Sequence, residues 1–72
     1  MAVLRVRFGR KLKYLRKKID LTQEQLAEKT GLSVDFIGMI ERGERAPSFE
    51  TVEILAKVLK TKVSDLFVEE EE

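Results

Sequence analysis

The chemistry available to this chain of 72 residues is limited by what it lacks, because it contains no histidine and no cysteine. Histidine is the commonest general base and metal ligand in proteins, and a thiolate is another frequent metal ligand. The sequence therefore predicts no enzyme, no metal site and no cofactor. The charged side chains are fourteen Lys and Arg and thirteen Asp and Glu, which bind ions of opposite charge.

These charges are unevenly distributed along the chain. Residues 1–18 hold eight Lys or Arg and no acid, whereas residues 19–72 hold six bases and thirteen acids. Such asymmetry is typical of a protein with one side directed toward nucleic acid. The alternative is a solvated helix face followed by an acidic tail. For residues 68–72, which end in four glutamates, we favour the acidic tail.

The segment SVDFIGMIERG, at residues 33–43, is an unusual short helix. It has the capping serine and terminal glycine of a short helix, yet Gly38 lies in its middle. Glycine at such a position costs about 1 kcal/mol relative to alanine. The segment also places Val34 and Met39 away from its own apolar stripe. The periodicity alone leaves open what lies against the outer side of this helix.

The elements that position these residues are predicted to be helices joined by short loops, since the chain has four glycines and one proline. Apolar residues recur at helical spacing from Phe8 to Ile19, which predicts a first helix ending near Lys18. Residues 1–7 are either an N-terminal arm, in which apolar and basic residues partly alternate, or the start of this helix.

Three cap signals predict the helices that follow. Thr22 and Gln25 fit a capping box for a second helix, which Gly31 ends after about two turns. Ser33 and Ser48 are the caps of a third and a fourth helix, and a final helical turn lies near residues 63–67. The prediction is five short helices and no sheet.

The segment LRKKIDLTQEQLAEKTGLSVDFIGMIERGERAPSFETVEILAKVL is preceded by the pattern F-G-x-x-L-x-x-L-R and followed by DLF. Together these motifs closely resemble the lambda-repressor-like, Cro-type family, over roughly residues 8–67. The resemblance implies a compact, all-α, five-helix DNA-binding domain whose helices 2 and 3 form a helix-turn-helix. The third helix would enter the major groove of double-stranded DNA.

The resemblance also implies which residues read bases. Gly38 would let the helix approach DNA closely, and Val34 and Met39 would lie against thymine methyl groups. Asp35 would accept from a cytosine amino group or orient an arginine. The face has no Gln, Asn or Lys, so the alternative is a helix that reads little sequence directly and depends on DNA shape. The predicted base-reading residues are Ser33, Val34, Asp35, Gly38 and Met39.

Matching positions in the family imply contacts to phosphate and one ion pair. Arg16 and Glu41 would pair, either to fix the arginine for a phosphate or as a structural ion pair alone. Family members often have asparagine at Ala46 and glycine at Lys60, so the chain departs from the pattern there. The predicted phosphate contacts are Thr22, Gln23, Arg16, Arg42, Arg45 and Ser48.

The function that we expect is a sequence-specific transcription regulator that binds a pseudo-palindromic operator as a homodimer. The short architecture resembles restriction–modification controller proteins, and the sequence does not separate these from Cro-type repressors or antitoxins. Residues 1–6 are an alternative dimer surface. The predicted dimer interface consists of Val58, Lys62, Val63, Leu66, Phe67 and Val68.

A protein-interaction module that keeps the fold but reads no DNA is the rival hypothesis, motivated by the donor-poor third helix and a net charge of +1. Steep salt dependence of duplex binding would separate the two. We expect neither a membrane nor a small-molecule ligand as a partner. The lack of cysteine and of long apolar runs makes a cytoplasmic location the default expectation.

Overall fold

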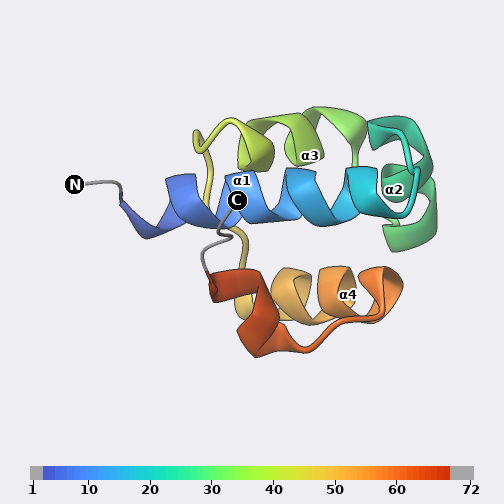
Figure 1. Ribbon diagram of the computed structural model, residues 1–72. Helices are drawn as coiled ribbons and strands as arrows, with labels where there is room; N and C mark the ends of the chain where they lie inside the picture. Colours follow the sequence, from blue (N-terminus) through green and yellow to red (C-terminus); the bar gives the residue numbers. More distant parts are fainter. Residues whose placement is uncertain (1–2, 69–72) are drawn as a thin grey trace.

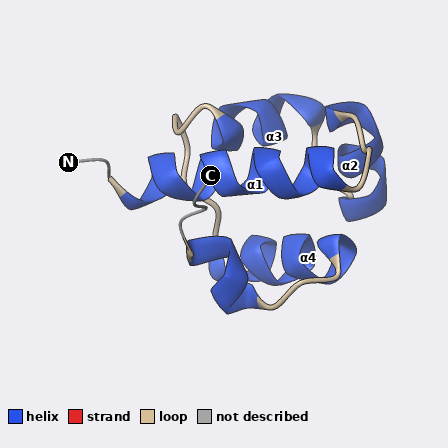
Figure 2. Ribbon diagram, in the orientation of Figure 1, coloured by secondary structure: helices blue, strands red, loops and turns tan. Residues whose placement is uncertain are grey.

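The computed structural model describes residues 3–68 as four α-helices and one short 3₁₀-helix (Figure 1). No strand occurs among these residues (Figure 2), so the all-α fold class predicted from the sequence is confirmed for the described part of the chain. The elements are α1 (Leu4–Lys18), α2 (Gln23–Thr30), α3 (Val34–Glu41), α4 (Phe49–Leu59) and the 3₁₀-helix η1 (Val63–Phe67).

The three predicted caps are present. The Thr22 hydroxyl accepts a hydrogen bond from the Gln25 backbone N–H at 3.0 Å, and the Gln25 side-chain oxygen accepts from the Thr22 N–H at 2.8 Å. The serines before α3 and α4 also accept a backbone hydrogen bond from the first turn of their helices. Gly31 ends α2 in the left-handed conformation, at φ 78°. These caps satisfy backbone N–H groups that have no partner inside the helix.

Helix α1 crosses the middle of the molecule, with α3 along one side and α4 and η1 along the other (Figure 1). Helix α2 packs against α3 and α4. Every element contributes apolar side chains to one core, which is why five short elements are stable together. The core consists of Phe8, Leu12, Leu26, Ala27, Ile37, Ile40, Val52, Leu55, Ala56, Leu59 and Leu66.

The close crossing of α1 and α3 depends on Gly9. A Cβ atom built on Gly9 would overlap the carbonyl oxygen of Ile40 and lie 2.8 Å from that of Glu41. Both oxygens belong to the backbone of α3, so neither can move away without moving the helix. The absence of a side chain at Gly9 therefore sets how closely the two helices approach.

The N-terminal segment is the start of α1 and not a separate arm, for the residues that are described. The helix begins at Leu4, although its N-cap Val3 provides no side-chain hydrogen bond. Arg5 donates from Nε to the carbonyl oxygen of Gly43 at 3.0 Å. Gly43 also packs against Val6, because a Cβ on this glycine would lie 2.8 Å from a Val6 methyl carbon. Contacts with the α3–α4 loop thus extend the helix by one turn.

One further detail differs from the sequence-based expectation. Ile19 follows the end of α1 and is 45% exposed, so the apolar stripe stops one turn earlier than its spacing suggested. The final helical turn predicted near residues 63–67 is present as η1, a 3₁₀-helix of five residues. The predicted tail begins with Val68, which is exposed, and its four glutamates lie outside the described residues.

Lys60, which stands where similar proteins often have glycine, ends α4 in the left-handed conformation, at φ 58° and ψ 46°. A residue with a Cβ atom is strained there by about 1–2 kcal/mol. The fold keeps the turn that glycine normally makes, and the lysine adopts it at that cost.

None of the helices in residues 3–68 is long and apolar enough to span a membrane.

Candidate nucleic-acid interface

The outer face of α3 is open to solvent, as its amphipathic pattern predicts. Ile37 and Ile40 are fully buried beneath it. On the opposite side, Val34 is 36% exposed and Asp35 is also exposed, while Met39 is half-buried. The cap Ser33 is exposed at the N-terminal tip of the helix. The structure therefore brings the predicted base-reading residues together on one accessible surface.

Gly38 belongs to this surface, even though its own small area is covered. A Cβ atom on Gly38 would meet only the guanidinium of Arg42, whose Nη1 would lie 3.1 Å away. The glycine therefore faces outward, and Arg42 lies over it. Together they form part of a shallow hollow between α3 and the start of α2, lined by Gln23, Glu24, Val34, Asp35, Gly38, Met39 and Arg42.

Arg42 is held in this position by Glu44. Its Nε donates to one carboxylate oxygen at 2.9 Å and its Nη2 to the other at 3.2 Å. The hydrogen bonds and the charge of Glu44, with a smaller contribution from Asp35, raise the pKa of Arg42. The hydrogen bonds from Arg42 lower the pKa of the Glu44 carboxyl. Each shift favours the charged form of its group, and both side chains are more than half exposed.

Arg16 and Glu41 form a buried ion pair, which is the structural alternative considered for these residues. Arg16 donates from Nε and Nη2 to the two carboxylate oxygens at 2.7 and 3.1 Å, and from Nη1 to the Leu21 carbonyl oxygen at 2.7 Å. Arg16 is only 7% exposed. Its guanidinium is thus largely enclosed, which favours the structural role of the pair, and a phosphate contact by Arg16 stays a prediction.

Glu41 also orients Gln23. The Gln23 amide nitrogen donates to Glu41 Oε1 at 2.9 Å, so one carboxylate connects the end of α1, the start of α2 and the end of α3. Gln23 is half-buried at the first turn of α2 and borders the hollow next to α3. Its amide has a second N–H, which remains available to a ligand at the surface.

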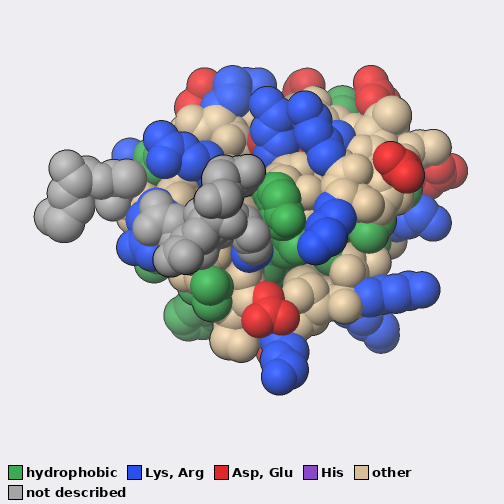
Figure 3. Space-filling view, in the orientation of Figure 1, with side chains coloured by type: hydrophobic (Ala, Val, Ile, Leu, Met, Phe, Trp, Pro, Cys, Tyr) green, Lys and Arg blue, Asp and Glu red, His purple; other side chains and the backbone are tan. Residues whose placement is uncertain are grey.

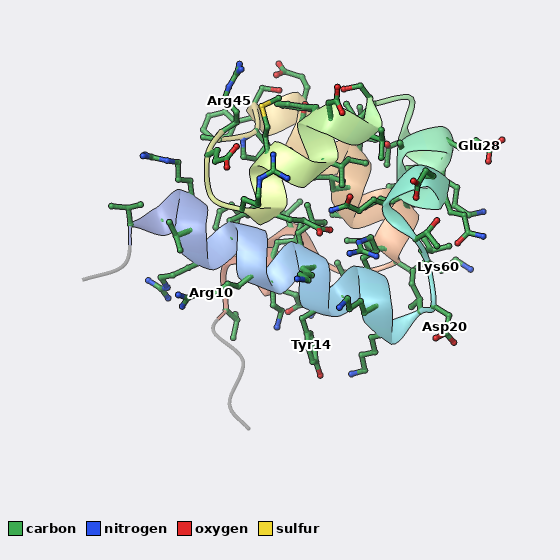
Figure 4. All side chains as sticks on the ribbon, turned by 90° about the horizontal axis from the view of Figure 1, so that it is seen from above. Arg10, Tyr14, Asp20, Glu28, Arg45 and Lys60 are labelled. Carbon is green, nitrogen blue, oxygen red and sulfur yellow. The ribbon has the colours of Figure 1, made fainter. Side chains whose placement is uncertain are left out.

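The other predicted phosphate residues lie at helix ends and in the α3–α4 loop. Thr22 and Ser48 are exposed caps of α2 and α4, whose first backbone N–H groups favour anions. The Arg45 guanidinium lies over the Phe36 ring, 5.9 Å from its centroid. Figure 4 shows Arg45 on the opposite side of the molecule from Arg10 and Tyr14. Arg45 and the start of α2 therefore lie next to α3, through Phe36 and through the hollow that Gln23 lines.

A second basic region lies on α1, away from this interface. The ammonium groups of Lys11 and Lys18 lie 5.6 and 5.5 Å from the centroid of the Tyr14 ring. Figure 3, which has α1 toward the viewer, shows Lys and Arg side chains spread across this side. The basic charge of residues 1–18 is consequently not confined to the neighbourhood of α3, contrary to the simplest interpretation of the charge asymmetry.

The predicted dimer residues divide into surface and core. Val63 is 43% exposed and Val68 is 55% exposed, and Lys62 is also exposed. Val58 is half-buried against the core. Leu66 is fully buried in the protomer, so its assignment to an interface is wrong. The helical turn of η1 directs Leu66 inward while its neighbours stay outside.

Phe67 belongs to an apolar groove that the sequence pattern did not reveal. Its ring lies 5.2 Å from that of Phe8, and it is still 38% exposed. Phe49, in the first turn of α4, is 87% exposed beside the same groove. The only sequence signal was a large apolar residue directly after the Ser48 cap. The groove is lined by Val3, Leu4, Arg5, Phe8, Ala46, Pro47, Phe49, Val52 and Phe67.

Glu44 is another functional candidate that sequence reasoning missed. The spacing of Arg42 and Glu44, with one glycine between them, was the available signal. Glu44 lies in the loop between α3 and α4, however, and in a loop the spacing along the chain does not determine whether two side chains meet. The described residues contain no cluster of three or more carboxylates that could hold a metal ion.

Comparisons with known proteins agree with this geometry. A protein family described as helix-turn-helix matches residues 12–66. An uncharacterized HTH-type transcriptional regulator of Methanocaldococcus jannaschii is 42% identical over 62 residues, covering 86% of this chain and 94% of the relative. The immunity repressor protein of Bacillus phage phi105 is 44% identical over the same length, which is 43% of that repressor.

A solved structure is similar over nearly its whole length. The restriction-modification controller protein C.AhdI from Aeromonas hydrophila superposes with a TM-score of 0.85 at 38% sequence identity. The match covers 88% of this chain and 96% of the controller protein.

Proposed function

The chain belongs to the helix-turn-helix family of DNA-binding transcription regulators, which are not enzymes, and from that membership we propose that it binds a pseudo-palindromic operator as a homodimer. We assign the helix-turn-helix to α2 and α3 of a lambda-repressor-like domain with η1 as its fifth helix. The observation that carries this proposal is the outer face of α3, which is accessible and is bordered by groups that bind anions. In this family the second helix of the motif lies in the major groove.

Base edges would be contacted by the exposed surface of α3. Val34 and Met39 present hydrocarbon suited to thymine methyl groups, and Asp35 presents an acceptor suited to a cytosine amino group. Gly38 keeps the middle of the helix free of bulk. Ser33 contacts the groove edge from the N-terminal tip.

Phosphates would be held on both sides of α3. Gln23 and Thr22 act from the start of α2, and Ser48 acts from the start of α4. Arg45 acts from the loop between α3 and α4, with its guanidinium supported by Phe36. Arg16 acts only indirectly, because it fixes Glu41 and through it Gln23. Phosphate contacts position the protein, and base contacts give the specificity.

The proposed dimer places two α3 helices about one helical turn of DNA apart, roughly 10–10.5 bp from centre to centre or a multiple of that distance. One helix of eight residues contacts too few base pairs to select an operator by itself. The exposed apolar side chains near η1 support a protein–protein interface, since such surfaces mark interaction sites. We propose that Lys62, Val63, Phe67 and Val68 contribute to it, with Val58 at its edge.

Regulation would follow the concentration of the dimer. The resemblance to C.AhdI over most of the chain favours a controller-type role, in which the protein binds its operator without a small-molecule effector. A phage-type repressor remains the second candidate within the same class, given the similarity to the immunity repressor of Bacillus phage phi105.

The alternative from another class is a protein-interaction module. It is favoured by the apolar groove beside Phe49, which lies away from α3 in the fold. A module of this kind would bind duplex DNA weakly and without sequence preference.

Selection of bound duplexes from a random pool, followed by titration in salt and sizing of the complex, tests the proposal. We expect a selected sequence with two related half-sites and a complex that contains two protein chains. The logarithm of the binding constant should fall linearly with the logarithm of salt concentration, by about 0.9 per phosphate contacted. Failure to select any sequence would contradict a sequence-specific regulator and favour the interaction module.

A further inference from the structure

The outer face of α3 has few hydrogen-bond donors in the amino-acid sequence, and the fold supplies one. Arg42 follows the end of α3, yet its guanidinium does not extend away from the helix. Nη1 is the guanidinium atom that would lie closest to a Cβ on Gly38, one helical turn earlier. The side chain is thus folded back over the reading surface, into space that is empty because residue 38 is glycine.

Glu44 fixes which edge of the guanidinium is offered to a ligand. The carboxylate accepts from Nε at 2.9 Å and from Nη2 at 3.2 Å, so it occupies the Nε/Nη2 edge of the planar group. Within residues 3–68 no acceptor takes a hydrogen bond from Nη1. The Nη1/Nη2 edge therefore keeps two parallel N–H donors in a fixed orientation, and the side chain is 59% exposed.

The charge of the pair argues against a phosphate as its main ligand. The carboxylate of Glu44 cancels the charge of Arg42 and would lie close to any phosphate that the guanidinium contacted. A neutral pair with two parallel donors instead suits an uncharged group with two adjacent acceptors. Of the four bases, guanine alone presents two acceptors, N7 and O6, on its major-groove edge. Adenine, by contrast, presents an acceptor next to an amino group, which would oppose a donor.

We propose that Arg42, supported by Glu44 and accommodated by Gly38, contacts a guanine of the operator with its Nη1/Nη2 edge. This inference rests on the proposed function and specifies it, because it predicts a guanine in each half-site. It also changes the role of Arg42 from phosphate contact to base contact. Gly38 then serves two purposes, since it lets α3 approach DNA and makes room for the arginine.

The test begins with the operator selected by the wild-type protein, in which each guanine is replaced in turn by 7-deazaguanine. That analogue lacks the N7 acceptor and leaves the pairing with cytosine intact. We expect one position per half-site at which the replacement weakens wild-type binding about tenfold or more. Arg42→Lys should bind the unmodified operator and the 7-deazaguanine operator nearly equally, because lysine lacks the planar pair of donors that would contact N7 and O6 together. Arg10→Lys, on the far side of the molecule, is the matched control and should keep the wild-type difference.

Glu44→Gln separates a supported base contact from a simple surface ion pair. The variant removes a negative charge beside the DNA, so it should bind all duplexes more tightly and depend on salt more steeply, by about one unit of slope. It should also reduce the penalty for 7-deazaguanine, since the guanidinium is no longer held in place. Glu53→Gln on the exposed side of α4 is the control and should change neither quantity.

Two results would overturn the inference while leaving the proposed function intact. One is a selected operator in which no guanine replacement distinguishes the wild type from Arg42→Lys. The other is a Glu44→Gln variant with the wild-type penalty and salt dependence. If the wild-type protein selects no sequence at all, the proposed function fails and this inference fails with it.

Discussion

At the scale of single residues, Glu41 is a charged side chain on which the fold depends. It is 9% exposed and accepts hydrogen bonds from both Arg16 and Gln23. Removing its charge would leave the Arg16 guanidinium buried without a counter-ion, which costs far more than an exposed ion pair contributes. The pair is therefore a requirement of the fold and not only a feature of the binding surface.

Glu41→Gln should lower the free energy of unfolding by about 3–5 kcal/mol, measured by urea denaturation. The matched control is Glu44→Gln, whose partner Arg42 is exposed, and it should change this free energy by less than about 0.5 kcal/mol. Equal effects of the two substitutions would contradict the buried role of Glu41.

A second prediction concerns the left-handed residues that end two helices. Lys60→Gly should relieve the strain at φ 58° and so raise the free energy of unfolding. The gain should be at most about 1 kcal/mol, because glycine also increases the entropy of the unfolded chain. Gly31→Ala should lower it by about 1 kcal/mol, since a Cβ on Gly31 meets no atom within 4 Å and only the backbone opposes it. Thermal denaturation measures both, and the same sign for both changes would refute this explanation.

At the scale of elements, the contact between α1 and α3 determines where the binding surface lies. Gly9 permits this contact, whereas Gly38, in the middle of α3, faces outward. The two glycines thus have opposite roles despite similar positions inside helices.

Gly9→Ala should destabilise the fold by about 1–3 kcal/mol, because the added methyl group meets backbone oxygens of α3 that cannot move independently. Gly38→Ala should keep or raise stability by up to about 1 kcal/mol, since alanine favours a helix and only the flexible end of Arg42 must move. Circular dichroism during urea titration provides both values. A destabilised Gly38→Ala variant would place that glycine in the core and refute the assignment of the outer face.

The positions of the elements could largely be predicted from the sequence, because local signals determine them. Thr22, Ser33 and Ser48 cap their helices through hydrogen bonds that span only three residues. Contacts between distant segments could not be predicted in this way. No local pattern indicates that Arg5 donates a hydrogen bond to the Gly43 carbonyl oxygen, 38 residues away, or that α1 begins at Leu4.

The candidate site was predicted to a similar extent. The helical period identified the outer face of α3, whereas the conformation of Arg42 depends on Glu44 in an irregular loop. The phosphate role of Arg16 was assigned by resemblance, and the side chain is in fact enclosed by Glu41 and Leu21.

At the scale of the whole molecule, the proposed activity requires two copies of the chain. Val63 and Val68 are exposed, so charges introduced there should disrupt an interface without disturbing the core. Val63→Glu combined with Val68→Glu should shift the protein to a monomer in sedimentation analysis. The affinity for the operator should then fall about a hundredfold or more, because the two half-sites are no longer bound together.

Ile54→Glu is the control for this prediction, since Ile54 is 39% exposed on α4 and outside the proposed interface. It should leave both the dimer and the operator affinity unchanged. A double variant that stays dimeric would place the interface elsewhere, with the groove beside Phe49 as the next surface to test.

Competitive titration of Gly38→Leu tests whether the outer face of α3 selects a DNA sequence. The assay compares binding to the selected operator with binding to a scrambled duplex, and circular dichroism verifies the fold. The wild-type protein should prefer the operator about a thousandfold or more. Gly38→Leu should remain folded and lose that preference, because its side chain fills the space in which α3 and Arg42 meet the groove. A folded Gly38→Leu variant that still prefers the operator as strongly as the wild type would show that this face of α3 does not select the sequence.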